Sequence, residues 1–129
     1  MKVQVCMATK SSIALLLEDE PLIAMDLEMT LAAAGFEVST VMSCAEANSW
    51  LEQRTPDVVV VDIELRDGSC TDVVARLVEA NIPFVVHTGE HPALHAGTPF
   101  SRGAWVGKPA APEALVQAVR DVVEGFIAA

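Results

Sequence analysis

The chain has 129 residues and a mass of 13.7 kDa, which suits one compact domain rather than two. Apolar residues make up 52% of it, which excludes an intrinsically disordered chain. Eight basic side chains stand against eighteen acidic ones, and the net charge of −10 disfavours direct binding to nucleic acid. No uncharged run approaches the roughly 20 residues of a transmembrane helix, and the apolar run 13–17 is too short for a signal peptide, so we expect no membrane insertion.

The cysteines indicate the redox environment. Cys6, Cys44 and Cys70 are odd in number and lack the spacing of a metal site. This pattern predicts reduced thiols and a cytoplasmic location.

Short aliphatic runs alternate with longer helical patterns along the chain. The predicted strands cover 13–17, 37–41, 58–61, 84–86 and 104–106, and the predicted helices cover 21–34, 44–53, 71–81 and 112–127. The four valines 58–61 are apolar on both faces, as in a strand covered on both sides. We therefore expect an α/β fold: a five-stranded parallel sheet of flavodoxin-like order 2-1-3-4-5, with helices on both faces.

One segment interrupts the alternation. A fourth helix is expected between residues 88 and 103, but Pro92, Gly97 and Pro99 lie within it. At most a short turn around 93–96 fits there. We expect the fourth helix to be short or disordered, in a mobile segment that resembles a loop.

Polar residues follow four of the predicted strands. Glu18 and Asp19 follow the first strand and Asp62 the third, while Thr88 and Lys108 follow the fourth and fifth. In the order 2-1-3-4-5 these four strands are neighbours, so their carboxyl ends meet in the crevice where open α/β sheets bind ligands. Three clustered carboxylates require a cation, and oxygen ligands favour Mg²⁺.

Such a site suits phosphoryl chemistry. The metal and Lys108 would neutralise phosphoryl oxygens, Thr88 would donate a hydrogen bond, and one aspartate could attack phosphorus. Each residue also has a structural explanation: Asp19 can begin a helix, Asp62 can lie in a turn, and Lys108 can be a solvated lysine. We interpret His87, His91 and His95 as surface or loop histidines, and Trp50 and Trp105 as core or interface residues.

Three segments together resemble the response-regulator receiver domain of bacterial two-component signalling: LLLEDEP (15–21), VVVVDIELRDGS (58–69) and GKP (107–109). The resemblance implies that Asp62 is phosphorylated and that Glu18, Asp19, Asp62 and the backbone carbonyl of Glu64 hold Mg²⁺. It also implies that Thr88 contacts the phosphoryl oxygens and that Lys108 pairs with them. Trp105 occupies the place of the family's switch aromatic. The expected organisation is an N-terminal extension (1–11) and a receiver domain (12–129) without an output domain.

A further segment, PFVVHTG (83–89), resembles a stand-alone subgroup with a Pro-Phe-x-Phe-Ala-Thr-Gly motif, although Val86 and His87 replace two of its residues. The subgroup implies a sensor histidine kinase of the HWE type as partner. Family members usually dock kinases on the first helix, where Leu22, Met25 and Met29 are candidate contacts.

The resulting prediction is a single-domain response regulator that accepts a phosphoryl group on Asp62 in a Mg²⁺-dependent reaction and slowly dephosphorylates itself. Its output would be a downstream protein or phosphotransferase. Three alternatives remain: a flavodoxin, a haloacid-dehalogenase-type phosphatase in which Glu64 would be the acid–base group, and a degenerate receiver that binds partners without phosphorylation. The acidic residues 18–20 disfavour the first, because they would repel a flavin phosphate.

Overall fold

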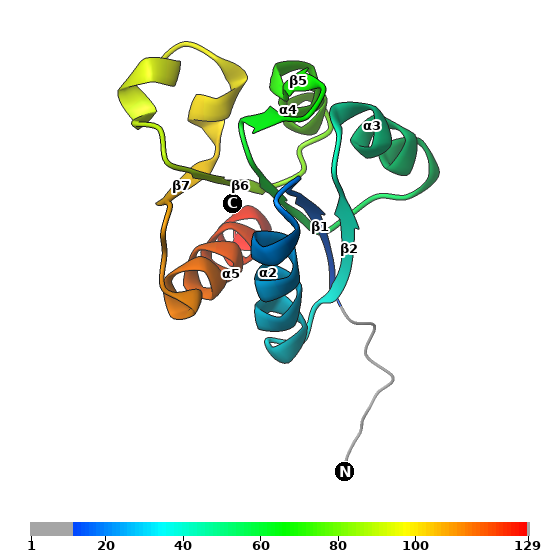
Figure 1. Cartoon of the computed structure of the whole chain (residues 1–129), viewed down its shortest axis with the longest axis vertical. Helices are drawn as coiled ribbons and strands as arrows, with labels where there is room; N and C mark the ends of the chain where they lie inside the picture. Colours follow the sequence, from blue (N-terminus) through cyan, green and yellow to red (C-terminus); the bar gives the residue numbers. More distant parts are fainter. Residues whose placement is uncertain (1–11, 129) are drawn as a thin grey trace.

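A computed structural model describes residues 12–128 as one central sheet covered by helices on both faces (Figure 1). All five strands are parallel, and their order is β2-β1-β3-β6-β7. This confirms the predicted order, with β6 and β7 as the fourth and fifth strands. The strands are β1 (Ile13–Leu17), β2 (Glu37–Val41), β3 (Val58–Val61), β6 (Phe84–Thr88) and β7 (Ala104–Gly107).

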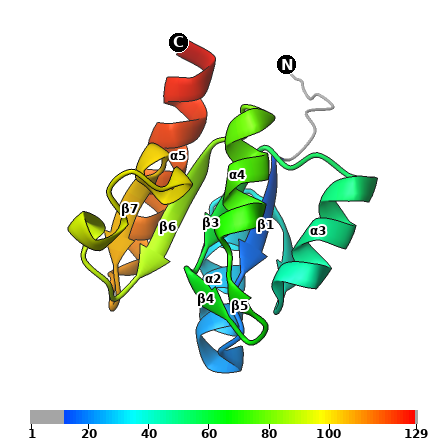
Figure 2. The same ribbon diagram turned by 90° about the horizontal axis from the view of Figure 1, so that it is seen from above.

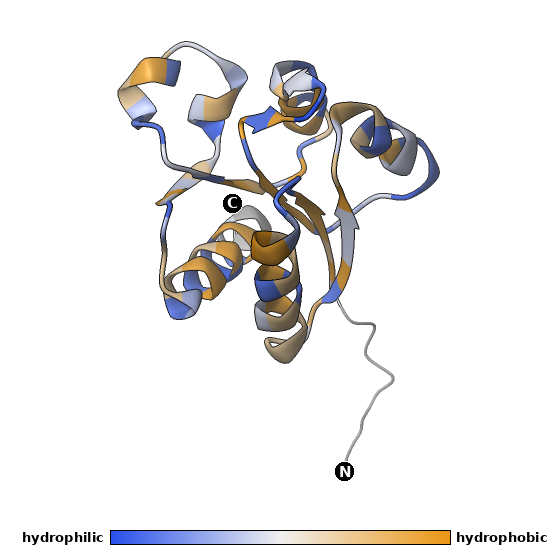
Figure 3. Cartoon of the chain, viewed as in Figure 1, coloured by the Kyte–Doolittle hydropathy of each residue, from blue (hydrophilic) through white to orange (hydrophobic). Residues whose placement is uncertain are grey.

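Two helices cover each face of the sheet. The helices α2 (Pro21–Ala33) and α5 (Pro112–Ala128) lie on one face, and α3 (Cys44–Gln53) and α4 (Thr71–Glu79) lie on the other (Figures 1 and 2). Hydrophobic residues concentrate on the central strands (Figure 3).

Strand β3 shows how the alternation of side chains builds two cores. Val58 and Val60 pack towards α2 and α5, whereas Val59 and Val61 pack towards α3 and α4. All four valines are buried. The strand is therefore fixed on both faces, and the residue that follows it, Asp62, is held at a defined place on the sheet edge.

Two helices end slightly earlier than predicted, and two strands end later. Helix α2 ends at Ala33 and α4 at Glu79, while β6 continues through Thr88 and β7 through Gly107, where these two residues pair. A short antiparallel hairpin of β4 (Glu64–Leu65) and β5 (Gly68–Ser69) directly after Asp62 was not predicted.

Two 3₁₀ helices replace the fourth helix. They are η1 (Pro92–His95), at the predicted turn, and η2 (Pro99–Arg102), which was not predicted. Each begins at a proline, a residue that fits the first helical turn because no backbone N–H is required there. Phe100 of η2 is 1% exposed and packs in the core between the sheet and α4, so this segment is anchored although it is not α-helical.

Within residues 12–128, no helix has both the length and the apolar character needed to cross a membrane. The predicted N-terminal extension (1–11), with Cys6, lies outside the described residues, and so do the side chains at the end of α5, including Phe126.

Gly103 allows β7 to begin against the core. A Cβ at this position would meet the ring of Phe84 and lie 2.9 Å from the Phe84 carbonyl oxygen. We predict that Gly103→Ala lowers the free energy of unfolding by about 2 kcal/mol through overpacking, measured by urea denaturation. Gly89→Ala, where a Cβ would meet nothing within 4 Å, is the matched control. Equal stability of the two variants would contradict the explanation.

Candidate functional site

The predicted site residues lie at one edge of the sheet, at the carboxyl ends of four strands. The register pairs Leu17 of β1 with Val61 of β3, so the residues that follow them, Glu18 and Asp62, lie on neighbouring strands. Backbone hydrogen bonds continue past the strands: the amide of Asp62 donates to the Leu17 carbonyl (3.2 Å), and the amide of Lys108 donates to the Thr88 carbonyl (2.9 Å). The parallel sheet thus brings together residues that are up to 90 positions apart in the chain.

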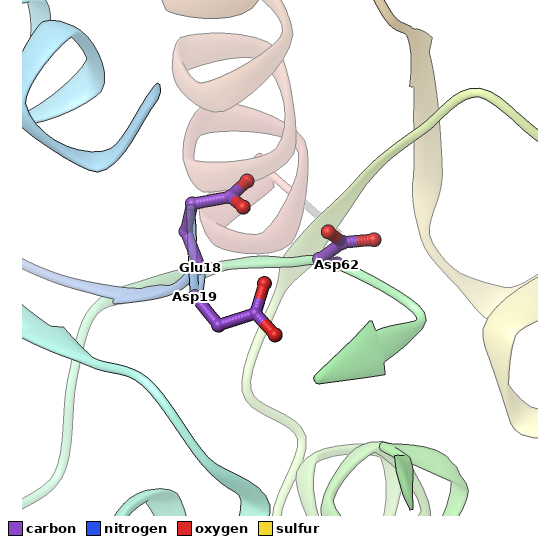
Figure 4. A group of neighbouring side chains, drawn as sticks. All are labelled: Glu18, Asp19 and Asp62. Atoms are coloured by element: carbon purple, nitrogen blue, oxygen red, sulfur yellow. The ribbon is translucent and has the colours of Figure 1, made fainter. Parts of the chain in front are cut away.

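Three carboxylates gather there. Glu18, Asp19 and Asp62 each offer an oxygen, and these atoms lie within 4.8 Å of one another. Figure 4 shows the side chains of Glu18 and Asp19 reaching towards the side of Asp62. Glu18 is 1% exposed, and its second oxygen accepts a hydrogen bond from the amide of Glu20 (3.1 Å). Asp19 and Asp62 are half-buried.

Lys108 joins this cluster as its cation. Its Nζ donates to Asp62 Oδ2 (2.9 Å) and to Glu18 Oε1 (3.1 Å). Burial alone would lower the pKa of Lys108, but the hydrogen bonds and charges of Asp62 and Glu18 outweigh it, so the pKa is raised. Lys108 is therefore an ammonium ion at neutral pH, held between two carboxylates.

Thr88 is buried at the end of β6, next to β7. Its Oγ1 accepts a hydrogen bond from the amide of Glu90 (3.2 Å), and among the described residues its hydroxyl donates to no protein acceptor. The hydroxyl proton is thus available to a ligand at the sheet edge.

His87 corrects the interpretation of the three histidines. It lies inside β6, is 5% exposed, and lines a groove of about 580 Å³ between α2 and the residues after β7, so it is neither a surface nor a loop residue. Its Nδ1 has no hydrogen-bond partner among the described residues. Burial lowers the pKa of His87, the charge of Lys108 lowers it further, and that of Asp62 opposes them, so the ring stays neutral at neutral pH.

The other two histidines do lie in the segment after β6. His91 is exposed, and its Nδ1 caps η1 by accepting from the amide of Ala93 (3.0 Å). His95 is half-buried, with Nε2 2.8 Å from Glu90 Oε1 and its ring 5.8 Å from that of Trp105. Trp105 is half-buried and donates from Nε1 to the Phe100 carbonyl (3.2 Å). Trp105 therefore contacts the segment that follows Thr88.

Glu64 stands two residues beyond Asp62, in β4, and its side chain is exposed. Its carboxylate does not belong to the cluster that Glu18, Asp19 and Asp62 form in the described part of the chain. In the same hairpin Asp67 caps α3, since its carboxylate oxygens accept from the amides of Cys44 (2.8 Å) and Ala45 (3.1 Å). This loop is thereby tied to the neighbouring helix.

The arrangement fits a hard divalent cation. The donors are carboxylate oxygens from two strand ends, which suit Mg²⁺, and within residues 12–128 the cluster includes no cysteine or histidine. With Lys108 and the Thr88 hydroxyl close by, the edge of the sheet can receive the oxygens of a phosphoryl group. Sequence reasoning missed His87, the Glu90–His95 pair and the hairpin. Of these, only the burial of His87 could have been predicted, because extending the fourth strand to Thr88 would have placed His87 inside the sheet.

Comparison with known proteins agrees with this architecture. A family model described as "Response regulator receiver domain" matches residues 14–120. The chain is similar to the probable transcriptional regulatory protein TcrX of Mycobacterium tuberculosis (30% identity over 110 residues, 82% of this chain and 47% of the relative). It is also similar to the DNA-binding transcriptional regulator NtrC of Bradyrhizobium sp. (28% over 93 residues, 70% of this chain and 19% of the relative).

Among solved structures, a response regulator receiver protein from Sinorhizobium medicae superimposes with a TM-score of 0.82 at 29% identity, covering 91% of this chain and 98% of the other. The chain spans between 19% and 47% of the length of the curated relatives that it matches.

The bridging role of Lys108 can be tested by stability. We predict that Lys108→Met lowers the free energy of unfolding by about 3 kcal/mol at neutral pH, because Glu18 is left buried without its cation. Since the pKa of Lys108 is raised in the folded state, this contribution is complete at neutral pH and disappears as the pH rises beyond the ordinary lysine value of 10.5. Urea denaturation of parent and variant between neutral and alkaline pH measures it.

Arg102→Met, which removes an exposed cation elsewhere, serves as the control and should change stability little. A Lys108→Met protein as stable as the parent at neutral pH would show that the bridge does not stabilise the fold.

Proposed function

The chain belongs to the response regulator receiver domain family, and we propose that it is a signalling switch that accepts a phosphoryl group on Asp62. Receiver domains are signalling modules rather than classical enzymes; histidine kinases phosphorylate them, and they bind partners. The observation that carries the proposal is the Lys108 ammonium, 2.9 Å from Asp62 and 3.1 Å from Glu18, beside a third carboxylate.

Receiver domains bind Mg²⁺ at an acidic pocket, and the oxygens of this cluster fit that ion. Glu18, Asp19 and Asp62 would hold it, with the backbone carbonyl of Glu64 as a further ligand. When bound, the ion would offset the negative charge of the carboxylates and of the phosphoryl oxygens.

In the proposed reaction a carboxylate oxygen of Asp62 attacks the phosphorus of a phosphohistidine. An O–P bond forms, the P–N bond breaks, and its electron pair returns to the imidazole nitrogen of the kinase. Lys108 then pairs with phosphoryl oxygen, and the Thr88 hydroxyl donates to another. Attack of water on the phosphorus of the acyl phosphate would break the bond to Asp62, release inorganic phosphate and restore the carboxylate, which is the slow self-dephosphorylation that we propose.

A chain of contacts leads from Thr88 towards Trp105. The amide of Glu90 donates to Thr88 Oγ1 (3.2 Å), the Glu90 carboxylate meets His95 Nε2 (2.8 Å), and the His95 ring packs against Trp105. We infer that movement of Thr88 towards a phosphoryl group shifts Glu90 and, through His95, the indole. Thr88 and Trp105 would then act together as the switch.

The kinase would dock on α2, whose outer face exposes three large apolar side chains: Leu22, Met25 and Met29. Unbranched methionines adapt to a partner surface. The similarity of residues 83–89 to the stand-alone subgroup motif supports an HWE-type kinase and a single-domain regulator. The odd number of cysteines, which lack metal-site spacing, supports a cytoplasmic location. The output would be a downstream protein or a phosphotransferase, because the charge of −10 disfavours DNA.

The family of the chain separates the three alternative functions. Membership of the receiver family removes the flavodoxin and the haloacid-dehalogenase-type phosphatase. A degenerate receiver, which binds partners without phosphorylation, has the same fold. Asp62 with the acidic pair and the Lys108 ammonium, and Thr88 whose carbonyl accepts from the Lys108 amide, favour phosphoryl acceptance over the degenerate receiver.

The phospho-acceptor is tested directly by mass. Incubation with acetyl phosphate and Mg²⁺ should add one phosphoryl group to the parent and none to Asp62→Asn, and EDTA should abolish the labelling of the parent. Asp72→Asn, an exposed carboxylate of α4, is the matched control and should label like the parent. Equal labelling of Asp62→Asn would overturn the assignment of Asp62, and an unlabelled parent would favour the degenerate receiver.

The switch is tested by fluorescence. Trp50→Phe leaves Trp105 as the single tryptophan. In that background, beryllium fluoride with Mg²⁺ should change the Trp105 emission, because the indole lies at the end of the contacts from Thr88. His95→Leu should reduce this change in emission by about half or more, because the variant removes the ring that links Glu90 to Trp105.

Two controls complete this experiment. Beryllium fluoride without Mg²⁺ should have no effect, and His91→Leu, a variant of the exposed histidine, should behave like the background. An emission that ignores beryllium fluoride in the presence of Mg²⁺ would rule out coupling through Trp105.

A further inference from the structure

Two thiols lie in contact beside the phospho-acceptor loop. Cys44 Sγ and Cys70 Sγ are 3.3 Å apart, and both cysteines are unpaired thiols. Cys44 is the first residue of α3 and is half-buried, whereas Cys70 immediately precedes α4 and is completely buried. The pair therefore joins two helices that lie on the same face of the sheet.

The hairpin that follows Asp62 contacts both cysteines. The Cys44 thiol is near the carbonyl oxygens of Gly68 (3.7 Å) and Ser69 (3.6 Å), and the Cys44 amide donates to Asp67 (2.8 Å). The amide of Cys70 donates to the Ile63 carbonyl (2.8 Å). These contacts hold the backbone on each side, so a covalent bond between the sulfurs requires only a short approach of the two sulfur atoms.

We propose that Cys44 and Cys70 form an oxidative modification site, at which a hydroperoxide converts the two thiols into a reversible disulfide. This inference does not depend on phosphoryl acceptance by Asp62. In a reducing compartment the dithiol form dominates, and a disulfide between such residues acts as a transient redox mark.

The chemistry balances with hydrogen peroxide as the oxidant. The partly exposed Cys44 sulfur attacks one peroxide oxygen, the O–O bond breaks, and Cys44 becomes a sulfenic acid with release of one water. The Cys70 sulfur then attacks the Cys44 sulfur, the S–O bond breaks, and a second water leaves. The two thiols together lose two protons and two electrons, which reduce one hydrogen peroxide to two waters.

The environment sets the rate of the first step. Burial raises the pKa of Cys44, and Asp67 adds to the increase, although the hydrogen bond with Cys70 opposes it. Burial, contact with Cys44 and the charges of Asp62 and Asp67 raise the pKa of Cys70. Because the thiolate is the nucleophile, oxidation should be slow at neutral pH and should accelerate as the pH rises. The second step is intramolecular, which favours it over reaction with a second peroxide, and the raised pKa of Cys70 makes this step accelerate with pH as well.

The disulfide would connect α3 to α4 across the hairpin. The residues between the sulfurs include Asp62 and the whole loop that follows it, so oxidation would restrict this loop in the folded state and shorten the unfolded chain. A redox signal would thereby change the mobility of the segment next to Asp62.

The site is tested on the full chain by treatment with hydrogen peroxide followed by intact mass and peptide mapping. We expect a monomer lighter by two hydrogens with a Cys44–Cys70 crosslink, reversed by dithiothreitol and formed faster at alkaline pH. Cys6→Ser should retain the crosslink, and Cys44→Ser and Cys70→Ala should each lose it. A dominant sulfinic acid, an intermolecular disulfide or a crosslink to Cys6 would overturn the proposal.

The effect on the loop has its own measurement. Amide hydrogen exchange of residues 64–69 should slow in the oxidised parent, and the Tm should rise by an amount on the order of 10 °C. Neither change should appear in peroxide-treated Cys44→Ser, the half-buried position at which the hydroxyl is best tolerated. Identical exchange and Tm in the crosslinked and reduced parent would refute the mechanical role of the disulfide.

Discussion

Two carboxylates that follow neighbouring strands cannot share a buried corner of a sheet unless a cation joins them. In this protein Lys108 is that cation, with its ammonium between Asp62 and the almost fully buried Glu18. The two ion pairs hold the lysine ammonium between these acids at the sheet edge. A phosphoryl group on Asp62 would compete with Glu18 for the same ammonium. Phosphorylation would therefore weaken the ion pair between Lys108 and Glu18.

The parallel sheet makes this arrangement possible. Each strand contributes its carboxyl end to the same edge, and the register of β1, β3, β6 and β7 places the residues that follow them side by side. This is why strand order alone predicted the convergence of Glu18, Asp62 and Lys108 from the sequence. The strength of the prediction came from β3, whose four valines could be explained only by burial on both faces.

The parts that sequence reasoning could not reach depend on contacts rather than on periodicity. The β4–β5 hairpin has strands of two residues, too short to show alternation, and Cys44 and Cys70 meet only because two helices begin side by side. His87 was placed outside the sheet because the fourth strand was predicted to end at Val86, but β6 continues past it and buries it. Pro92 and Pro99 correctly excluded an α-helix. They did not reveal that Phe100 would anchor the second turn in the core.

The pair of 3₁₀ turns between β6 and β7 has an evolutionary consequence. An α-helix transmits any change in length to its whole packed face, because each residue added rotates all those that follow. Here the segment between the two strands leaves the sheet after Thr88, buries the side chain of Phe100 in the core, and rejoins the sheet after Gly103. Residues can be gained, lost or exchanged on either side of that anchor without altering the strand register, so lineages could diversify the surface of this segment while the acidic site stays intact.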